Sequence, residues 1–372
     1  MKIGYFTDNF PPRIGGVATY SFELPYYFKK LRPESEIEVI VFDRQLNPDQ
    51  PISISGVKIS RFPKNSVWQT GKIIFKIIKN SHFDVVQATT FFPVGFWVAL
   101  LAKIFKVKSC LTIYGTEAVT HYGSFLTKAV KYLTLLMFDE IAAFSQSTKK
   151  LMLDRQQLNK RKISVIYPAI SELDSERIYD VRDKFELAAD DFVVLFVGRL
   201  VARKGALDLI KAVALTGDEK IKLILAGGGE QDQLEQYVKD NNLAKQIFFA
   251  GNIPHEGILN YYQAAQVFSM PSFFDKNKGD IEGLGIVYLE AQINGLPVIG
   301  TDSGGIPEAI ADKVSGFVVP ARDINALADK IKLLKNDQEL YQKMSQQAVD
   351  FVKREFNWQK NIDQHLVIYK KK

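Results

Sequence analysis

The stretch that decides the fold runs from Asp280 to Pro307 and reads DIEGLGIVYLEAQINGLPVIGTDSGGIP. It begins and ends in loop residues. Between them, the spacing of apolar residues predicts a helix over Leu284–Asn294. A short apolar run then predicts a buried strand over Pro297–Thr301. A helix that leads directly into a buried strand is typical of α/β proteins.

Two carboxylates frame the predicted helix. Glu282 precedes it and Glu290 lies two turns in, so at the helical rise they are roughly 12 Å apart. A nucleotide's ribose and a sugar beyond its pyrophosphate are separated by a similar distance. The backbone N–H groups of Leu284, Gly285 and Ile286 lie at the helix N-terminus, which favours phosphate. The pattern therefore predicts the sugar at Glu282, phosphates at the helix start and the ribose at Glu290. The alternative is two surface glutamates on an ordinary helix.

Length and composition indicate a soluble protein of two domains. The chain has 372 residues, of which 47% are hydrophobic and 24% charged. The N-terminal MKIGYFTDNF lacks the pattern of a signal peptide, and the longest near-apolar run, Phe91–Ala102, is shorter than the ~18 residues that span a bilayer. Cys110 is the single cysteine, which excludes an intramolecular disulfide and fits a reducing cytoplasm.

Charge is distributed unevenly. Residues 1–168 carry 23 Lys and Arg against 12 Asp and Glu, whereas the remainder carries 25 against 30. A basic first half suggests an anionic partner such as a membrane surface, a lipid-linked phosphate or nucleic acid. The alternative is a dispersed set of solubilising lysines. A predicted helix at 66–80 has Lys72, Lys76 and Lys79 on one side. Such a helix can lie on an anionic membrane, although more often its apolar face packs on a sheet.

Short apolar runs alternate with amphipathic runs along the whole chain, which predicts two doubly wound α/β domains. The polar segment from 168 to 191 shows no strand pattern and marks the crossover between them. We therefore expect a first domain over residues 1–170 and a second over 171–355.

The first domain opens with a strand, a Gly-Gly loop and a helix. Residues 2–8 predict a buried strand, and the loop NFPPRIGG ends at Gly15 and Gly16 before a helix over 17–31. This order is how an α/β domain opens a phosphate-facing site, and a side chain at either glycine would block close backbone approach. The loop is not G-x-G-x-x-G, so a dinucleotide-binding fold is not supported. A flexible turn is the alternative.

The second domain begins with a strand from 192 that leads into a loop carrying Arg199 and Lys204. Two cations at the C-terminal end of a strand suit a pyrophosphate, because Arg forks across two oxygens and Lys adds a point charge. A strand over 221–229 ends in three glycines, so a nucleobase could approach the backbone at Gly229. Solvated loop cations are the alternative for this region.

These motifs together resemble the donor-site signature of family 4 retaining glycosyltransferases. The resemblance rests on EGLGIVYLEAQ (282–292), GLPVIGTDSGGIPE (295–308) and the GR-x4-K spacing of Arg199 and Lys204. The first string is particularly similar to the phosphatidylinositol mannosyltransferase branch. The resemblance covers nearly the whole chain and implies the GT-B fold, with two Rossmann-like doubly wound domains facing an inter-domain cleft. It also implies that the first domain binds the acceptor, the second binds the donor, and a C-terminal helix (356–372) crosses back to the first.

The resemblance implies a hexosyltransferase that moves a sugar from a UDP- or GDP-linked donor to a lipid-linked or saccharide acceptor, with retention of configuration. Glycolipid or cell-surface polysaccharide synthesis is the implied setting. Arg199, Lys204 and the helix N-terminus would stabilise the leaving diphosphate, and Glu282 would orient the sugar. The loop at Gly15 and Gly16 would close over the pyrophosphate. No metal or other cofactor is expected, since two cations and a helix dipole take the metal's role.

The chain departs from the family pattern at one position. The family usually has His-Gly where this chain has Tyr114-Gly115, and tyrosine can hydrogen-bond but carries no charge near pH 7. Glu117 matches an acidic position that follows and is a candidate on the acceptor side. The basic first half favours a lipid-linked acceptor and a peripheral position on the inner face of the cell membrane. No nucleic-acid-reading module is recognised, so no nucleic acid partner is expected.

Two alternatives from other classes remain open. A nucleotide-sugar epimerase of the same fold would need acid/base carboxylates in the first domain, and EGLGIVYLEAQ argues against it. A non-catalytic peripheral protein that binds anionic lipid is disfavoured by the joint presence of Arg199, Lys204, Glu282 and Glu290, whereas Tyr114 is consistent with it.

Overall fold

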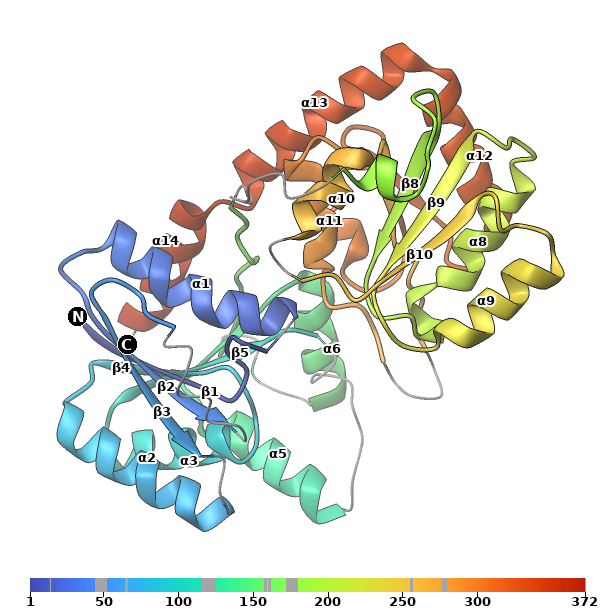
Figure 1. The fold of residues 1–372 in the computed structure, drawn as a ribbon. Coiled ribbons are helices and arrows are strands. Elements are labelled where there is room, and N and C mark those ends of the chain that lie inside the picture. Colours follow the sequence, from blue (N-terminus) through green and yellow to red (C-terminus); the bar gives the residue numbers. More distant parts are fainter. Residues whose placement is uncertain are drawn as a thin grey trace. The chain divides into compact units, whose positions relative to one another are not determined.

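The computed structural model shows two compact units. It describes residues 1–13, 15–43, 52–63, 66–115, 125–156, 159, 162–171, 180–254, 257–275 and 280–371. One unit consists of Met1–Pro168 with Trp358–Lys372, and the other of Ala169–Asn357. Each unit is built on a parallel sheet with helices packed against it (Figure 1).

The sheet of the first unit has seven strands, which follow the order β3-β2-β1-β4-β5-β6-β7 and pair in parallel throughout. Their bounds are β1 Lys2–Thr7, β2 Glu36–Asp43, β3 Val57–Pro63, β4 Val85–Ala88, β5 Lys108–Ile113, β6 Glu140–Ala143 and β7 Ile163–Val165. The strand order reverses between β1 and β4. In an open α/β sheet, ligands bind beyond the carboxyl ends of the strands at such a reversal.

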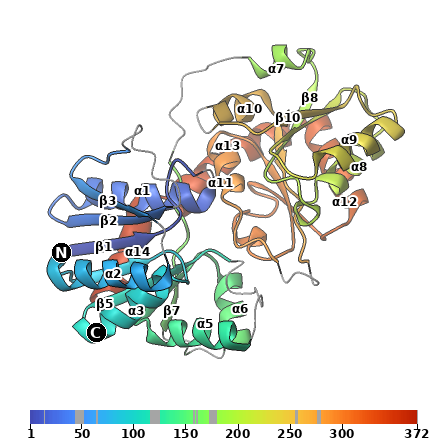
Figure 2. The same cartoon turned by 60° about the horizontal axis from the view of Figure 1, so that its bottom comes forward.

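Helices cover both faces of this sheet. They are α1 Gly16–Leu31, α2 Val67–Ser81, α3 Val94–Phe105, α5 Phe125–Met137, α6 Gln146–Gln156 and α14 Trp358–Lys370. Helices α2, α3 and α5 lie side by side on one face, and α1 packs with α14 on the other (Figures 1 and 2). The hydroxyl of Ser145 accepts the backbone N–H of Thr148 at 3.0 Å and so caps α6.

The C-terminal helix belongs to the first unit, as the predicted fold class requires. Trp358 stacks on Tyr27 with ring centroids 4.6 Å apart and on Tyr20 at 5.7 Å. One turn later, the amide of Asn361 donates to the carbonyl oxygen of Tyr167 at 2.7 Å. Only 6% of Trp358 is exposed, so these stacked rings anchor α14 through buried apolar area.

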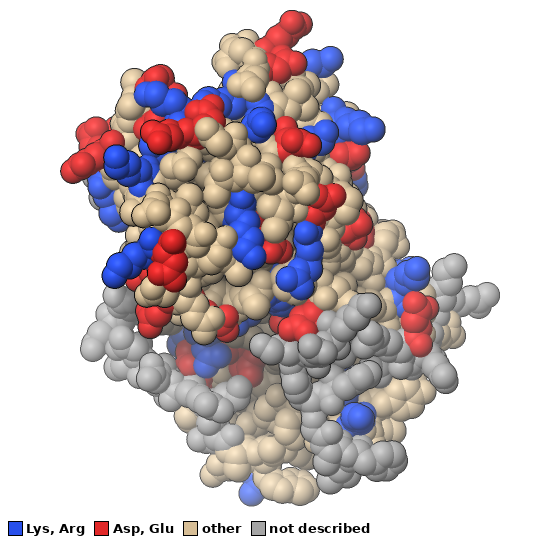
Figure 3. Space-filling model, turned by 90° about the vertical axis from the view of Figure 1, so that its right-hand side faces the viewer, with Lys and Arg blue, Asp and Glu red and all other residues tan. Residues whose placement is uncertain are grey.

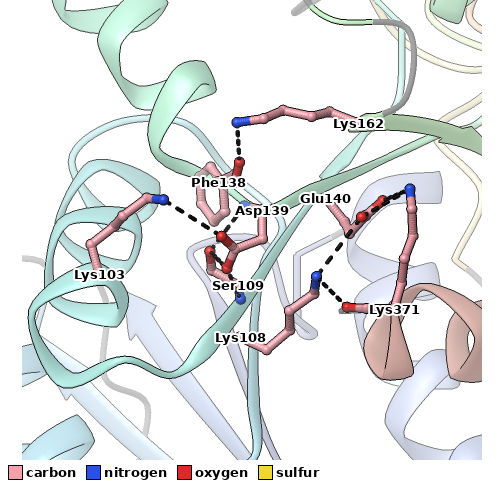
Figure 4. A network of polar contacts seen from close by, with 8 residues as sticks. All are labelled: Lys103, Lys108, Ser109, Phe138, Asp139, Glu140, Lys162 and Lys371. Atoms are coloured by element: carbon pink, nitrogen blue, oxygen red, sulfur yellow. Dashed lines mark hydrogen bonds and ion pairs between the residues drawn. The ribbon is translucent and has the colours of Figure 1, made fainter.

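Ion pairs hold the chain at the other end of α14 (Figure 4). The ammonium groups of Lys108 and Lys371 converge on the buried carboxylate of Glu140, at N–O distances of 3.8 and 3.0 Å. Beside it, Asp139 accepts the backbone N–H and the hydroxyl of Ser109, both at 2.9 Å. This network lies where β5 and β6 begin, at the opposite edge of the sheet from the strand ends where ligands bind in such folds, so we regard it as structural.

The sheet of the second unit has the order β10-β9-β8-β11-β12-β13, again with parallel pairing. Its strands are β8 Phe192–Val197, β9 Ile221–Ala226, β10 Ile247–Gly251, β11 Val267–Ser269, β12 Val298–Thr301 and β13 Gly316–Val319. Counted along the chain this is the 3-2-1-4-5-6 order of a Rossmann sheet, with its reversal between β8 and β11. Two doubly wound parallel sheets confirm the predicted α/β fold class.

The helical segments around this sheet are α7 Val181–Lys184, η2 Ala202–Lys204, α8 Ala206–Leu215, α9 Gln231–Asp240, α10 Ile258–Ala264, α11 Ile286–Ile293, η4 Ile306–Glu308, α12 Ile324–Asn336 and α13 Gln338–Glu355. The sequence pattern did not predict α9, because Leu234 and Val238 are its only buried side chains. The face of this unit in Figure 3 mixes Lys and Arg with Asp and Glu side chains.

Candidate functional site

The predicted donor-site residues of the second unit lie in the loops and helical turns that follow β8, β9 and β11, at the carboxyl edge of the sheet. Two of these loops are bonded together. The backbone N–H of Leu200 donates to the carbonyl oxygen of Gly228 at 2.8 Å, and that of Glu230 donates to the Leu200 oxygen at 2.6 Å. Gly229 has φ 140°, and a Cβ there would lie 2.6 Å from the Leu200 oxygen. Glycine at 229 therefore lets the loop that carries Arg199 pack against the turn after β9.

The two predicted phosphate-binding cations are in different environments. Arg199 is exposed, and among the described residues no side chain pairs with its guanidinium. Lys204 ends η2, and its ammonium nitrogen lies 2.5 Å from a carboxylate oxygen of Glu282. Both partners are largely buried, with side chains 12% and 14% exposed. The structure thus brings Lys204, which was predicted to bind phosphate, into contact with Glu282, which was predicted to bind the sugar.

Arg203 also binds Glu282 and was not predicted. Only 7% exposed, it places Nε 2.5 Å from Oδ2 of Asp280 and Nη1 3.2 Å from Oε2 of Glu282. Burial by itself would raise the pKa of Glu282, but Lys204 and Arg203 outweigh it and hold that pKa below its ordinary value. Glu282 is therefore ionised at neutral pH. The clue in the sequence was a second cation next to Lys204 and a second acid two residues before Glu282.

Glycines let the backbone approach Glu282 closely. The N–H of Gly305 donates to the carbonyl oxygen of Glu282 at 3.0 Å. Gly304 has φ 62°, and a Cβ there would lie 2.3 Å from the same oxygen. Gly285 has φ 86°, and its Cβ would lie 2.8 Å from the ring of Tyr288. The loop after β12 is therefore packed on the site at Gly304, where only glycine fits, and Gly285 allows the tight turn before α11.

Helix α11 begins later than the sequence pattern predicts. Gly285 is its N-cap in a left-handed conformation, so the helix runs from Ile286 to Ile293 rather than from Leu284 to Asn294. Glu282 precedes the helix, as predicted, but the residues between it and Ile286 are not helical, so the separation of ~12 Å from Glu290, which assumed helical rise throughout, does not describe this geometry. Leu284 is 2% exposed, so its side chain belongs to the core and only its backbone remains for a ligand.

Glu290 has a fixed partner on a neighbouring helix. The hydroxyl of Tyr262, on α10, donates to its Oε2 at 2.8 Å. Burial, together with the Glu290 carboxylate, raises the pKa of Tyr262 well above its usual value, so the hydroxyl keeps its proton and stays a donor. Glu290, the residue predicted to bind the ribose, is thus oriented by a buried tyrosine. The sequence analysis did not identify Tyr262, because nothing in its local pattern distinguishes it from other core aromatic residues.

In the first unit, Gly15 and Gly16 follow β1 at the start of α1. Gly15 is the N-cap with φ 136°, and its oxygen accepts the N–H of Ala18 at 2.9 Å. Both glycines are exposed, and a Cβ at Gly15 would meet nothing within 4 Å. The glycine at 15 is required by backbone conformation rather than by a close neighbour in this unit.

Tyr114, one of the two residues predicted on the acceptor side, is largely buried. The Tyr114 ring is 9% exposed and meets Phe144 edge-on at 4.6 Å and Tyr20 at 6.3 Å. It packs as a core residue, so a contact with sugar would require its buried hydroxyl to be reached. Glu117 lies outside the described residues.

Comparisons with known proteins match both halves of the chain. The model for "Glycosyltransferase Family 4" matches residues 14–172, and that for "Glycosyl transferases group 1" matches residues 179–351. A GDP-mannose-dependent alpha-(1-6)-phosphatidylinositol monomannoside mannosyltransferase of Mycobacterium tuberculosis is 31% identical over 374 residues, covering 95% of this chain and 94% of that protein. A GDP-mannose-dependent monoacylated alpha-(1-6)-phosphatidylinositol monomannoside mannosyltransferase of Corynebacterium glutamicum is 26% identical, covering 95% and 93%.

Solved structures share the fold over the full length. Anabaena Alr3699/HepE in complex with UDP has a TM-score of 0.78 at 20% identity and covers 99% of both chains. A glycosyltransferase from Rickettsia africae has a TM-score of 0.80 at 21% identity and covers 99% of this chain and 97% of its own.

Proposed function

Because this chain belongs to the family 4 glycosyltransferases and is similar to their phosphatidylinositol mannosyltransferase branch, we propose that its second unit binds the donor at the carboxyl edge of its sheet. The protein is a hexosyltransferase of GT-B fold that uses a nucleotide-sugar donor. The observation that carries the placement is the buried, ionised Glu282, which follows β11 and is held between Lys204 and Arg203 of the loop after β8, with the loop after β12 bonded to its backbone.

The difficult step is departure of a diphosphate that gains negative charge. We propose that Arg199 and Lys204, with the N-terminus of α11, stabilise that charge, and that no metal is required because they supply its positive potential. The exposed Arg199 guanidinium has its donors available for a bidentate contact. Glu282 orients the hydroxyls of the sugar, and Glu290, held by Tyr262, accepts from the ribose. The acceptor oxygen bonds to the anomeric carbon on the face from which the diphosphate leaves, and the leaving phosphate oxygen takes the acceptor's proton. Attack on that face gives retention of configuration.

Ligand-induced stabilisation tests the donor site. GDP, UDP and their sugars, each at about 100 times its dissociation constant, should raise the unfolding free energy of the second unit by about 2.7 kcal/mol. Arg199→Ala, Lys204→Ala and Glu290→Ala should each lose most of that gain and release less free nucleotide with an acceptor present. Lys239→Ala, an exposed lysine on α9, is the matched control. Equal donor binding in all four variants contradicts the placement.

The names of the relatives favour GDP-mannose among the donors, so we propose it as the first to test. The two alternatives from the sequence, an epimerase and a non-catalytic lipid-binding protein, are not favoured, because family matches to glycosyltransferases cover both units. An epimerase would convert the donor without any acceptor, which the same nucleotide-release assay distinguishes.

The outer face of α2, α3 and α5 suggests where a lipid-linked acceptor would be met. Of the thirteen large apolar side chains that are exposed in the described part of the chain, eight lie on or beside these helices. They are Val67, Trp68, Phe75, Phe92, Ile104, Tyr132, Leu133 and Leu136. Trp68 is 73% exposed, and its ring contacts that of Trp97 at 5.7 Å. Exposed apolar area of this extent in one place indicates an interaction surface.

The charge of this face selects an anionic partner. Helices α2, α3 and α5 carry six lysines and no Asp or Glu. On α2, Trp68, Lys72, Phe75 and Lys79 follow at intervals of four, three and four residues and so share one stripe. We propose that this face rests on an anionic membrane, with aromatic rings at the interface and lysines among the headgroups. The acceptor would then be lipid-linked and met at the inner face of the cell membrane. Within the described residues, no helix is long and apolar enough to cross a bilayer.

Vesicle flotation tests this proposal. Each lysine near an anionic surface contributes about 1 kcal/mol, so replacing Lys72, Lys76 and Lys79 together with Gln should weaken binding to phosphatidylglycerol vesicles by roughly a hundredfold. Binding of the parent should also fall steeply with salt and be weak on neutral vesicles. The matched control replaces three exposed lysines of the second unit, namely Lys239, Lys245 and Lys332. A parent that stays unbound to anionic vesicles at low salt contradicts the proposal.

A further inference from the structure

The side chains of Lys204 and Glu282 form an ion pair with each other. The single oxygen Oε2 of Glu282 lies 2.5 Å from the Lys204 ammonium and 3.2 Å from Nη1 of Arg203. A lysine that turns its charge toward a diphosphate loses its close contact with this carboxylate. Glu282 is largely buried, and a buried carboxylate stripped of its cations is costly. The carboxylate therefore needs a second cation that stays when the first leaves.

We propose that Arg203 is a positioning residue that remains the counter-ion of Glu282 while Lys204 exchanges from Glu282 to the donor diphosphate. This inference rests on the proposed donor site. Arg203 itself would not contact the phosphate. Its role is to keep Glu282 ionised and aimed after Lys204 has moved.

The surroundings of Arg203 hold it in place. It is 7% exposed, its carbonyl oxygen accepts the N–H of Phe273 at 2.9 Å, and its Nε lies 2.5 Å from Asp280. Asp280 is in turn joined to Asp275 by backbone hydrogen bonds in both directions, at 3.0 and 3.3 Å. Among the described residues, Oδ1 of Asp280 has no hydrogen-bond partner, whereas Oδ2 accepts from Arg203.

Lys204 is held much less firmly. Within the described residues its ammonium has one acceptor, Glu282, and it ends a flexible four-carbon chain with freely rotating donors. Arg203 instead reaches two carboxylates through different nitrogens of one rigid plane. Of the two cations at Glu282, Lys204 is therefore the one whose departure breaks fewer contacts.

The exchange makes an unusual prediction for a nucleoside diphosphate that carries no sugar. Glu282→Gln removes the charge that competes for Lys204, so GDP or UDP should bind more tightly than to the parent, even though sugar transfer falls. Arg203→Gln leaves Lys204 as the last cation at Glu282, so binding should weaken about tenfold, or 1.4 kcal/mol. In the double variant Arg203→Gln/Glu282→Gln, position 282 carries no charge that needs a counter-ion once Lys204 leaves, so affinity should return to within a few-fold of Glu282→Gln alone.

Calorimetric titration of GDP and UDP into these four proteins tests the inference. Arg203→Lys should recover part of the affinity, since it keeps the charge. Arg182→Gln is the control for general destabilisation, because Arg182 is also built into the second unit but bonds the carbonyl oxygens of Ala264, Ala188 and Asp191 near the opposite edge of the sheet. It should leave nucleotide affinity unchanged.

Two results would overturn the inference. One is that Arg203→Gln lowers the affinity for GDP and UDP by the same factor in the parent and in the Glu282→Gln variant. That result would mean that Arg203 binds the phosphate directly. The other is weaker diphosphate binding in Glu282→Gln than in the parent, a measurement that holds even if Arg203→Gln fails to fold. Failure of the proposed function looks different, because the parent and Lys204→Ala would then bind GDP and UDP equally or not at all.

Discussion

The buried histidine of the C-terminal helix makes the first unit sensitive to acid. His365 has no exposed surface, and its Nδ1 lies 2.9 Å from the carbonyl oxygen of Asn361, one turn earlier in α14. Since a carbonyl only accepts, Nδ1 carries the hydrogen. Among the described residues Nε2 has no partner, so a second proton would place a charge and a donor in the core without an acceptor.

Burial lowers the pKa of His365 to about 4, against a partial offset from its bond to Asn361. The folded pKa is below the unfolded one, so the unfolded chain binds more protons between these values and stability falls as the pH drops. The contribution is complete above the unfolded value of about 6.5 and is lost toward pH 4. Linkage gives a loss of about 2 kcal/mol between pH 7.5 and pH 5, a substantial part of the stability of a typical domain.

Tryptophan fluorescence isolates this effect, because Trp68, Trp97 and Trp358 all belong to the first unit. Urea unfolding at pH 7.5 and pH 5 should show the parent losing about 2 kcal/mol more than His365→Gln, which cannot titrate. His82→Gln is the matched control, since His82 is exposed and should behave as the parent. If the parent and His365→Gln lose equal stability over this range, the reasoning from burial is refuted.

Three further substitutions probe the two units. Gly304→Ala should lower the unfolding free energy of the second unit by about 1–3 kcal/mol more than Gly217→Ala in urea titrations, because both have φ above 60° but only the first meets a backbone oxygen, at 2.3 Å. Tyr262→Phe removes the hydroxyl that orients Glu290 and should weaken nucleotide-sugar binding about fivefold by calorimetry, near the 1 kcal/mol of a typical hydrogen bond; unchanged affinity argues against a ribose contact. Trp358→Ala removes both stacked contacts of α14 and should cost the first unit about 3–5 kcal/mol in fluorescence-monitored unfolding, whereas a cost near zero would mean the helix is anchored elsewhere.

Local patterns predicted most of the elements. Strands such as β8 are covered on both faces and therefore read as continuous apolar runs, so they are recognised without knowing their partners. Helix α9 was missed because only two of its side chains are buried, which leaves little periodic signal. The start of α11 was misplaced because the left-handed conformation of Gly285 ends the preceding loop one residue before the helix, and apolar spacing does not report backbone conformation.

Local patterns also led to some residues of the candidate site. Arg199, Lys204, Glu282 and Glu290 stand at spacings that a local motif preserves, and the family matches are consistent with that motif. The partner of each acid was not predictable. Arg203 is separated from Glu282 by more than seventy residues in the chain, so nothing local links them.

The α/β class, the family and the residue types at the carboxyl edge of the second sheet could be read from the amino-acid sequence, because apolar periodicity, glycine requirements and charge spacing act over a few neighbouring residues. Three-dimensional packing was needed to show that Lys204 and Arg203 share one carboxylate, that a buried tyrosine holds Glu290, and that α2, α3 and α5, which carry exposed apolar side chains, lie side by side. Those facts depend on which loops and helices meet, and that is set by packing of the whole sheet rather than by any short stretch of chain.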